Sequence, residues 1–124
     1  MIAKNLTYED FDGNKHTDTF YFHLSKTELT GLAVEHPEGF EKYIQKIVEE
    51  QNAEEMFKLF GRLILMAYGE KINGTKFIKK KDGRRLSEDF ECSPAYDVLF
   101  DELINDPEEA KKFFNGMLPA SAEK

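Results

Sequence analysis

The chain has 124 residues, of which 40% are hydrophobic and 33% charged, and its formal net charge is −7. This length suits one domain with a single core, and this hydrophobic content is too high for a chain that is disordered throughout. The acidic charge argues against nucleic acid as the default partner, because it repels phosphates.

The cysteine content and the apolar runs indicate a cytosolic protein without a membrane partner. Cys92 is the single cysteine, so no internal disulfide can form, which suits a reducing compartment. The longest apolar run, "LILMAY", falls far short of the roughly 18 residues that span a membrane. The N-terminus, "MIAKNLTYED", lacks the apolar middle and the cleavage site of a signal peptide.

The N-terminal segment predicts a β-hairpin. The stretches "AKNLTYEDF" and "KHTDTFYFHL" flank the turn "DGN", in which glycine accepts positive φ. Alternation along the second strand places Phe20, Phe22 and Leu24 on one face, with Tyr21 and His23 on the other. An isolated hairpin is marginally stable in water, so we expect this one to pack on helices or join another sheet.

Two helices are predicted next. The stretch "SKTE" is a capping box, in which the Ser25 hydroxyl accepts from the N–H of Glu28 and the Glu28 side chain reaches back. It predicts a helix over residues 26–33, ended by "HPEG". A second, amphipathic helix is predicted because apolar residues recur on one helical stripe, formed by Phe40, Tyr43, Ile44, Ile47 and Val48.

The most apolar element is a helix predicted over residues 53–68, with Asn52 as its cap. Its apolar side chains cover far more than one stripe, so we expect it to lie centrally, with neighbours on several sides. Gly69 is interpreted as the C-terminal stop of this helix. Gly61 weakens the helix by roughly 1 kcal/mol relative to alanine, and a close helix crossing or a hairpin contact would explain its presence.

Residues 70–92 are polar and rich in turn signals, with "TKFI" as a candidate short strand. Helical period then resumes twice. Ser93 and Asp106 are the expected caps, each followed by a proline at the first helical position. The last helix directs Phe113, Phe114 and Met117 inward and stops at "NGMLP".

The sequence therefore predicts an α+β fold, mainly α, with an N-terminal β-hairpin followed by about five helices packed round a central apolar helix. We expect a single domain over residues 1–119 and a loose C-terminal tail over residues 120–124.

The sequence has no pattern that is typical of a catalytic or metal-binding site. His16, His23 and His36 lie in hairpin and turn segments without the spacing of metal ligands. Cys92 follows Glu91, whose charge opposes the lowered pKa that a nucleophilic thiol requires. The glycines have the spacing of turns rather than of a phosphate-binding loop, and no carboxylate pair is singled out as an acid and base. The sequence predicts no enzyme, no metal and no cofactor.

A basic stretch stands out in this acidic chain. "KFIKKKDGRR" contains Lys76, Lys79, Lys80, Lys81, Arg84 and Arg85. Three interpretations are open: a nucleic-acid contact, a protein-docking loop or a solvated loop. Binders of single strands interleave aromatic residues for stacking, and here only Phe77 is present, while the following "EDFE" repels phosphates. We therefore expect no nucleic-acid partner and an exposed loop that steers an acidic client or neighbour.

Four segments together resemble the tail assembly chaperones of long-tailed bacteriophages, of the siphophage type and particularly those of Gram-positive hosts. They are an opening like "TFYFxLxKxEL" at residues 19–29, a helix end like "LxxxAYGEK" at 65–71, a helix like "SEEF…AYxxLFxEL" at 87–103, and a final "FxxGxxP" at 113–119. Each motif is weak alone, but their order and spacing extend over nearly the whole chain.

The resemblance implies a non-enzymatic protein that binds and solubilises the tape measure protein and helps to recruit tail tube subunits. It also implies assembly in the host cytoplasm and absence from the mature virion. Many such genes make a longer product by translational frameshifting, whose extension addresses the tube protein, and this chain would correspond to the short form. The alternative is a structural protein such as a small head–tail connector or a tail completion protein.

Such a chaperone needs apolar surface that is exposed, or that self-association hides. The candidate partner-binding residues are Tyr21, His23, Lys79, Lys80, Lys81, Arg84, Arg85, Phe113, Phe114, Met117 and Leu118. For the aromatic stripe of the last helix, core packing is the stronger interpretation. The outer strand of the hairpin is a further candidate, because an open edge can pair with another copy to form a homo-oligomer.

Overall fold

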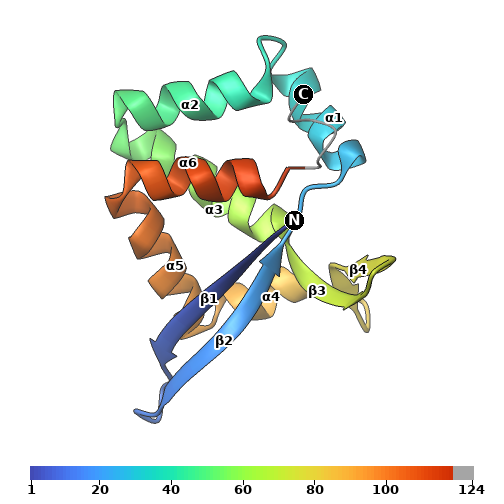
Figure 1. The fold of residues 1–124 in the computed structure, drawn as a ribbon, viewed down its shortest axis with the longest axis vertical. Coiled ribbons are helices and arrows are strands. Elements are labelled where there is room, and N and C mark those ends of the chain that lie inside the picture. Colours follow the sequence, from blue (N-terminus) through green and yellow to red (C-terminus); the bar gives the residue numbers. More distant parts are fainter. Residues whose placement is uncertain (119–124) are drawn as a thin grey trace.

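The computed structural model describes residues 1–118, in which a β-hairpin precedes a set of helices (Figure 1). Strands β1 (Ile2–Glu9) and β2 (Lys15–Phe22) pair antiparallel over their whole length, from Ile2 opposite Phe22 to Glu9 opposite Lys15. Gly13 adopts a φ of 86° in the turn between them. The predicted hairpin is confirmed, whereas Pro119 and the predicted loose tail lie outside the described residues.

A second hairpin extends the sheet. Strands β3 (Tyr68–Asn73) and β4 (Lys76–Ile78) add to it in the order β1-β2-β3-β4. β3 joins β2 through Tyr21 opposite Gly69 and Phe22 opposite Tyr68. β4 corresponds to the short strand predicted from "TKFI" at residues 75–78.

The interpretation of Gly69 as a helix stop is wrong. The preceding helix ends at Ala67, and Gly69 lies within β3. A Cβ atom on Gly69 would lie 2.4 Å from the carbonyl oxygen of Ile78 and 2.6 Å from the ring of Phe77. The residue is therefore glycine because β4 approaches its backbone closely, and not because a helix ends there.

Residues 1–118 contain six helices: α1 (Lys26–Glu35), α2 (Phe40–Glu50), α3 (Ala53–Ala67), α4 (Leu86–Glu91), α5 (Pro94–Asn105) and α6 (Pro107–Gly116). The capping box of Ser25 and Glu28 is formed, and Asn52 and Asp106 cap α3 and α6 through their side chains. Ser93 occupies the cap position of α5, but its hydroxyl donates to the carbonyl of Phe90 instead of accepting from the helix. The family resemblance implied one helix over residues 87–103, whereas the structure divides this stretch into α4 and α5, with Cys92 and Ser93 between them.

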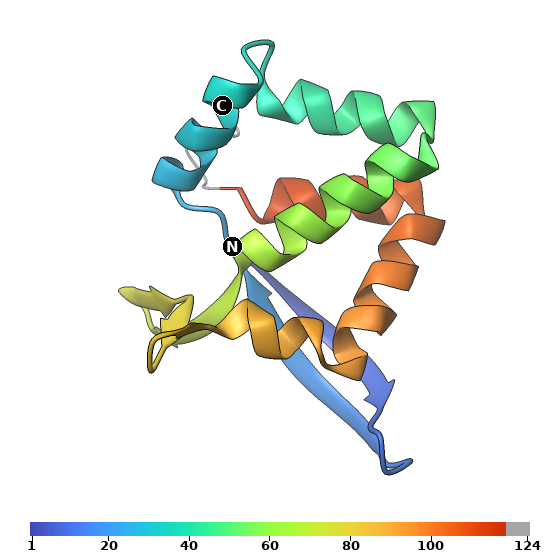
Figure 2. The ribbon, with the colours of Figure 1, turned by 180° about the vertical axis from the view of Figure 1, so that it is seen from behind.

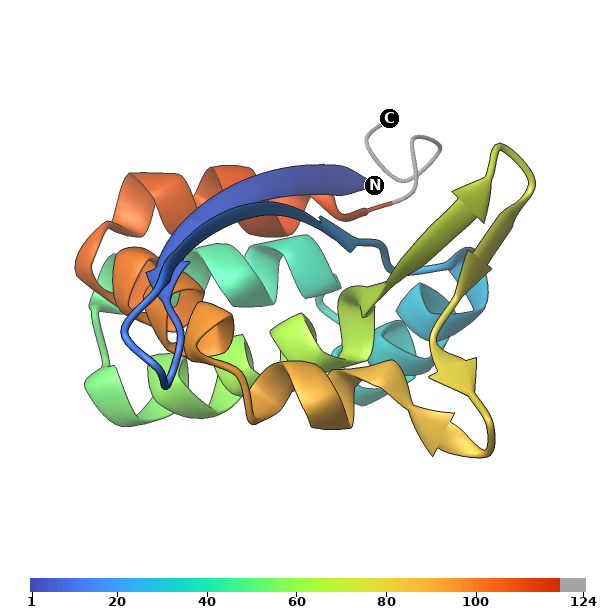
Figure 3. The ribbon, with the colours of Figure 1, turned by 90° about the horizontal axis from the view of Figure 1, so that it is seen from below.

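The N-terminal hairpin runs along α5 and α6 (Figure 3). Lys4 of β1 joins all three elements, because its Nζ atom lies 2.8 Å from Glu102 of α5 and 3.0 Å from Glu109 of α6. The segment after β2 is held from two sides, since the N–H of His23 donates to Ala67 and the N–H of Leu24 donates to Met117, the latter at 2.8 Å. On the opposite side of the molecule, α4 lies between α5 and the β3–β4 hairpin (Figure 2).

The buried residues form one connected cluster that is rich in aromatic rings. Phe22 packs against Phe90 and Phe113, with ring centroids 5.7 Å and 5.1 Å apart, and Tyr68 stacks on Phe90 at 4.2 Å. Helix α3 packs against α2, α4 and α5. It is not enclosed on every side, because the side chain of Phe57 is 65% exposed.

Candidate partner-binding surfaces

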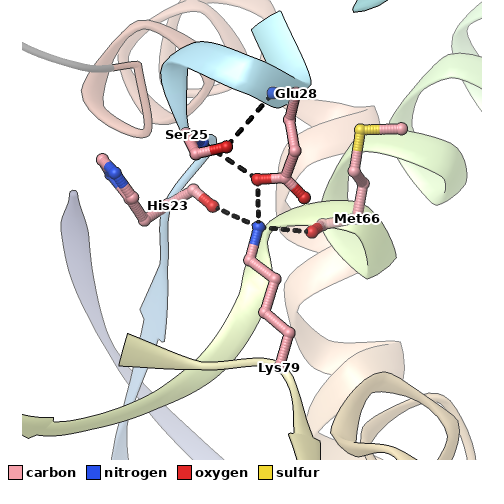
Figure 4. A network of polar contacts seen from close by, with 5 residues as sticks. All are labelled: His23, Ser25, Glu28, Met66 and Lys79. Atoms are coloured by element: carbon pink, nitrogen blue, oxygen red, sulfur yellow. Dashed lines mark hydrogen bonds and ion pairs between the residues drawn. The ribbon is translucent and has the colours of Figure 1, made fainter. Parts of the chain in front are cut away.

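Lys79, which opens the "KKKDGRR" run at residues 79–85, is not a surface residue. The side chain of Lys79 is only 16% exposed, and its Nζ atom donates three hydrogen bonds (Figure 4). The acceptors are the Glu28 carboxylate at 2.6 Å, the carbonyl of His23 at 2.7 Å and the carbonyl of Met66 at 2.8 Å. Lys79 therefore ties β2, α1 and α3 together, and the prediction that it lies in an exposed loop is wrong.

Glu28 has two roles. Besides accepting from Lys79, its carboxylate completes the capping box of α1 by accepting from the N–H of Ser25 at 2.9 Å. Burial acts to raise the pKa of Glu28, but the hydrogen bonds from Lys79 and Ser25 outweigh it and hold the pKa below the usual value. Burial lowers the pKa of Lys79, and the bond to Glu28 offsets this only in part. Three acceptors surround Nζ, so the network requires the ammonium form of Lys79.

The rest of the basic run forms a small hairpin. Strands β5 (Lys80–Lys81) and β6 (Arg84–Arg85) pair around a turn in which Asp82 and Gly83 have φ values of 54° and 80°. Lys80 and Lys81 are exposed. Arg84 is held by the carboxylates of Glu88, at 3.4 Å, and Asp89, at 2.9 Å, in the helix that follows. The surface charge of this hairpin is therefore carried mainly by its two lysines and Arg85.

Tyr21 and His23 are half-buried near the junction of the two sheet hairpins. The ring of His23 meets Phe77 edge-on at 6.1 Å, and its Nδ1 atom is buried without a hydrogen-bond partner among residues 1–118. Burial lowers the pKa of His23, and the positive charges of the N-terminus and Lys79 act in the same direction. The sequence predicted that this face carries both side chains, but it gave no sign that His23 is shielded from solvent.

The aromatic residues of the last helix belong to the core. Phe113, Phe114, Met117 and Leu118 are each at most 2% exposed, and Phe114 packs against Phe60 at 4.8 Å. In this fold they offer no exposed surface to a partner. The structure thus agrees with the core-packing interpretation of this stripe.

The exposed aromatic surface lies elsewhere, in a groove between α3 and α5. The groove has a volume of about 370 Å³ and is lined by Phe57, Tyr96, Asp97, Phe100, Asp101 and Ile104. Phe57 and Phe100 meet edge-to-face at 5.0 Å and form its floor. We call this the Phe57–Phe100 groove. Sequence reasoning used the apolar residues among them only as evidence of helical period and named none of the six as a candidate partner-binding residue.

Gly61 marks where α3 and α5 cross beside this groove. A Cβ atom on Gly61 would lie 3.4 Å from the hydroxyl of Tyr96 and 3.9 Å from the ring of Phe100. Of the two explanations predicted for this glycine, the structure supports the helix crossing. Both distances are those of ordinary van der Waals contact, so a methyl group at this position would touch the two side chains of α5 without a clash.

A larger cavity of about 470 Å³ lies between α1, α3 and the start of α4. Both carboxylates that line it are already paired, Glu35 with Arg62 at 2.8 Å and Glu28 with Lys79, and the cationic Arg85 lines it as well. In the Phe57–Phe100 groove, by contrast, no cationic side chain within residues 1–118 forms an ion pair with Asp97 or Asp101. Because its carboxylates are not paired among the described residues, the groove is the better candidate for a cationic partner.

The described residues were also compared with the requirements of a metal centre and of a membrane-spanning helix, and they meet neither. No group of three or more histidine, cysteine, aspartate or glutamate side chains in the described part of the chain is placed to hold a metal ion. None of the helices in residues 1–118 has the length and apolar character needed to cross a membrane.

An exposed aromatic groove and a basic hairpin on a small α+β domain are features of a protein that binds other proteins. Comparison with protein families identifies the family of this chain. Residues 1–124 match the family model described as phage tail assembly chaperone, and the chain belongs to this family. Its members are generally non-enzymatic, and a role in tail assembly is supported for this chain. No curated protein and no solved structure matches the chain.

Proposed function

We propose that the protein is a tail assembly chaperone that binds the tape measure protein, keeps it soluble and helps to recruit tail tube subunits. The observation that carries this proposal is the family match over the whole chain. The structure adds support of a physical kind, because the Phe57–Phe100 groove exposes aromatic surface on a chain whose net charge keeps it soluble.

The finer parts of the proposal follow from the same role. The chaperone acts in the host cytoplasm during assembly and is absent from the mature virion. It contacts the tail tube protein, through a longer frameshifted form where the gene makes one. Copies associate with one another, for which β1 is available because it is the outer strand of the sheet within the described residues. The parent phage is of the siphophage type with a Gram-positive host.

Co-expression tests the proposal. The tape measure protein of the same phage is produced with and without this protein, and the soluble fraction and the copurifying complex are measured. We expect the tape measure protein to precipitate alone and to stay soluble with many copies of this protein bound to each client. If the client precipitates equally in both cases, the proposed function is wrong.

Virion composition separates the chaperone from a structural role. Mass spectrometry of purified particles should find the tape measure protein and should not find this protein. A stoichiometric presence in mature particles would instead establish a head–tail connector or tail completion protein.

A further inference from the structure

The geometry points to the Phe57–Phe100 groove as the client site of the chaperone, and its occupant as an amphipathic helix whose apolar residues are flanked by two lysines or arginines one turn apart. This inference rests on the proposed function, which names a client but no surface for it.

The floor of the groove supplies the apolar half of the recognition. Phe57 is 65% exposed although it is a large apolar residue on a helix that is otherwise well covered. Its neighbours Phe100, Tyr96 and Ile104 are half-buried, so their free faces are turned to the same hollow. Aromatic rings that are held by packing yet remain open to solvent are the usual anchors of protein interfaces.

The rim supplies the charge. Asp97 and Asp101 are exposed, and both line the groove from α5. Asp97 gains some stabilisation from its place in the first turn of α5, and Asp101 accepts a hydrogen bond from the side chain of Asn105. Neither meets a cation in the described part of the chain. An approaching lysine or arginine would therefore gain an ion pair without displacing an existing one.

The spacing of the two aspartates indicates a helix as the partner. Asp97 and Asp101 are four residues apart on α5, which places their Cβ atoms about 5–6 Å apart on one row of the helix surface. Two basic residues four apart on a partner helix that lies alongside α5 have the same separation. A volume of about 370 Å³ holds a few apolar side chains from one turn of such a helix, rather than a folded domain.

Binding of designed peptides tests the groove without depending on the tape measure protein. The probe is a helical peptide with a leucine and phenylalanine stripe flanked by two lysines one turn apart, and its control has glutamates at those two positions. We expect the lysine peptide to bind the full chain at least about tenfold more tightly than the glutamate peptide, measured by fluorescence anisotropy. Equal binding of the two peptides would overturn the inference.

Matched substitutions locate the site. Phe57→Ser removes the most exposed ring of the groove, and Phe11→Ser removes a ring that is 85% exposed in the β1–β2 turn. Asp101→Lys reverses the rim charge, and Asp12→Lys makes the same change in that turn. We expect Phe57→Ser and Asp101→Lys each to weaken binding of the lysine peptide by about tenfold or more, with both turn variants within about twofold of the wild type. Thermal melting of each variant checks that the fold is kept.

The outcomes of co-expression separate this inference from the proposed function. If the wild type and Phe57→Ser keep the tape measure protein equally soluble, the groove is not the client site, although the chaperone function stands. If the lysine peptide binds in the groove but the wild type leaves the client insoluble, the chaperone function is wrong, and the groove remains a binding site for a basic amphipathic helix of another partner. If Phe57→Ser instead reduces the oligomeric state and leaves peptide binding intact, the groove joins copies of this chain and the inference is overturned.

Discussion

The ammonium group of Lys79 lies 2.6 Å from the carboxylate of Glu28, although the two residues are 51 positions apart in the chain. The contact fixes the start of α1 against the strand region that follows α3. Lys79 has two identical neighbours, Lys80 and Lys81, which are exposed. One lysine of the run is thus part of the structure, while the next two remain available for other contacts.

Replacement of Lys79 by methionine tests this distinction. Lys79→Met keeps most of the apolar stem but leaves the Glu28 carboxylate and two carbonyls without their shared donor, so we expect a loss of about 2–4 kcal/mol in the free energy of unfolding. Lys80→Met serves as the control and should change it by less than about 0.5 kcal/mol. Urea denaturation measures both. Equal small effects would show that the network contributes little.

Gly69→Ala tests the close approach of β4 to β3. The added methyl group would meet the backbone carbonyl of Ile78, which cannot move without disturbing the strand pair, so we expect a loss of about 1–3 kcal/mol. At Gly74, nothing lies within 4 Å of an added Cβ atom. Gly74→Ala should therefore leave the melting temperature within a few degrees of the wild type, and a comparable loss at both positions would contradict this explanation.

Substitution of Phe113 and of Phe57 should have different effects, because Phe113 lies in the core and Phe57 lies in the exposed groove. Phe113 is 1% exposed, so Phe113→Ala should cost about 3–5 kcal/mol of stability through lost burial and the cavity that remains. Phe57→Ala removes a ring that is mostly in solvent and should cost less than about 1 kcal/mol. Chemical denaturation measures the loss of unfolding free energy in each of the two variants. A large loss for Phe57→Ala would mean that this ring has a structural role.

The pH dependence of stability should contain a contribution from His23. Because the folded state lowers the pKa of this imidazole below its usual 6.5, the unfolded chain binds more protons in the range just below that value. Protonation therefore favours the unfolded state, and the contribution of His23 to stability is present above pH 6.5 and is lost as the pH falls through the folded pKa. In the variant His23→Phe, stability should fall less steeply between pH 7 and pH 5 than in the wild type. The urea midpoint of unfolding at each pH measures this. An unchanged slope would exclude this assignment.

The sequence predicted those elements whose signals are local. The β1–β2 turn follows from the Asp12–Gly13 pair, and α1, α3 and α6 begin at the expected Ser25, Asn52 and Asp106. Strand β3 was missed because its partner lies on β2, far away in the chain, and "YGEK" has no alternation of its own. Helix α4 was not recognised as a separate helix because its six residues are too few to show a helical period of their own.

The candidate site was harder to predict for a similar reason. Lys79 is largely buried, unlike Lys80, because its ammonium group reaches acceptors in three distant segments of the chain. The lysine run itself therefore contains no signal that distinguishes Lys79 from its neighbours. Phe57 did carry a usable signal, because it lies off the buried stripe of α3 that contains Met56, Phe60 and Leu63. An apolar residue outside the core-facing stripe of a helix is a candidate for surface contact, and here it forms the floor of the groove.

The hydrogen bond from the N–H of Leu24 to the carbonyl of Met117 has a consequence for when the protein can fold during its synthesis. The strand residues near position 24 leave the ribosome early, but the backbone that fixes them is synthesised only when residue 117 is reached. Throughout translation, Phe22 and Leu24 lack their cover from α6, so the N-terminal hairpin of the nascent chain keeps an apolar face open until the last helix arrives. Folding of this N-terminal hairpin onto its core is consequently completed only after most of the chain has emerged.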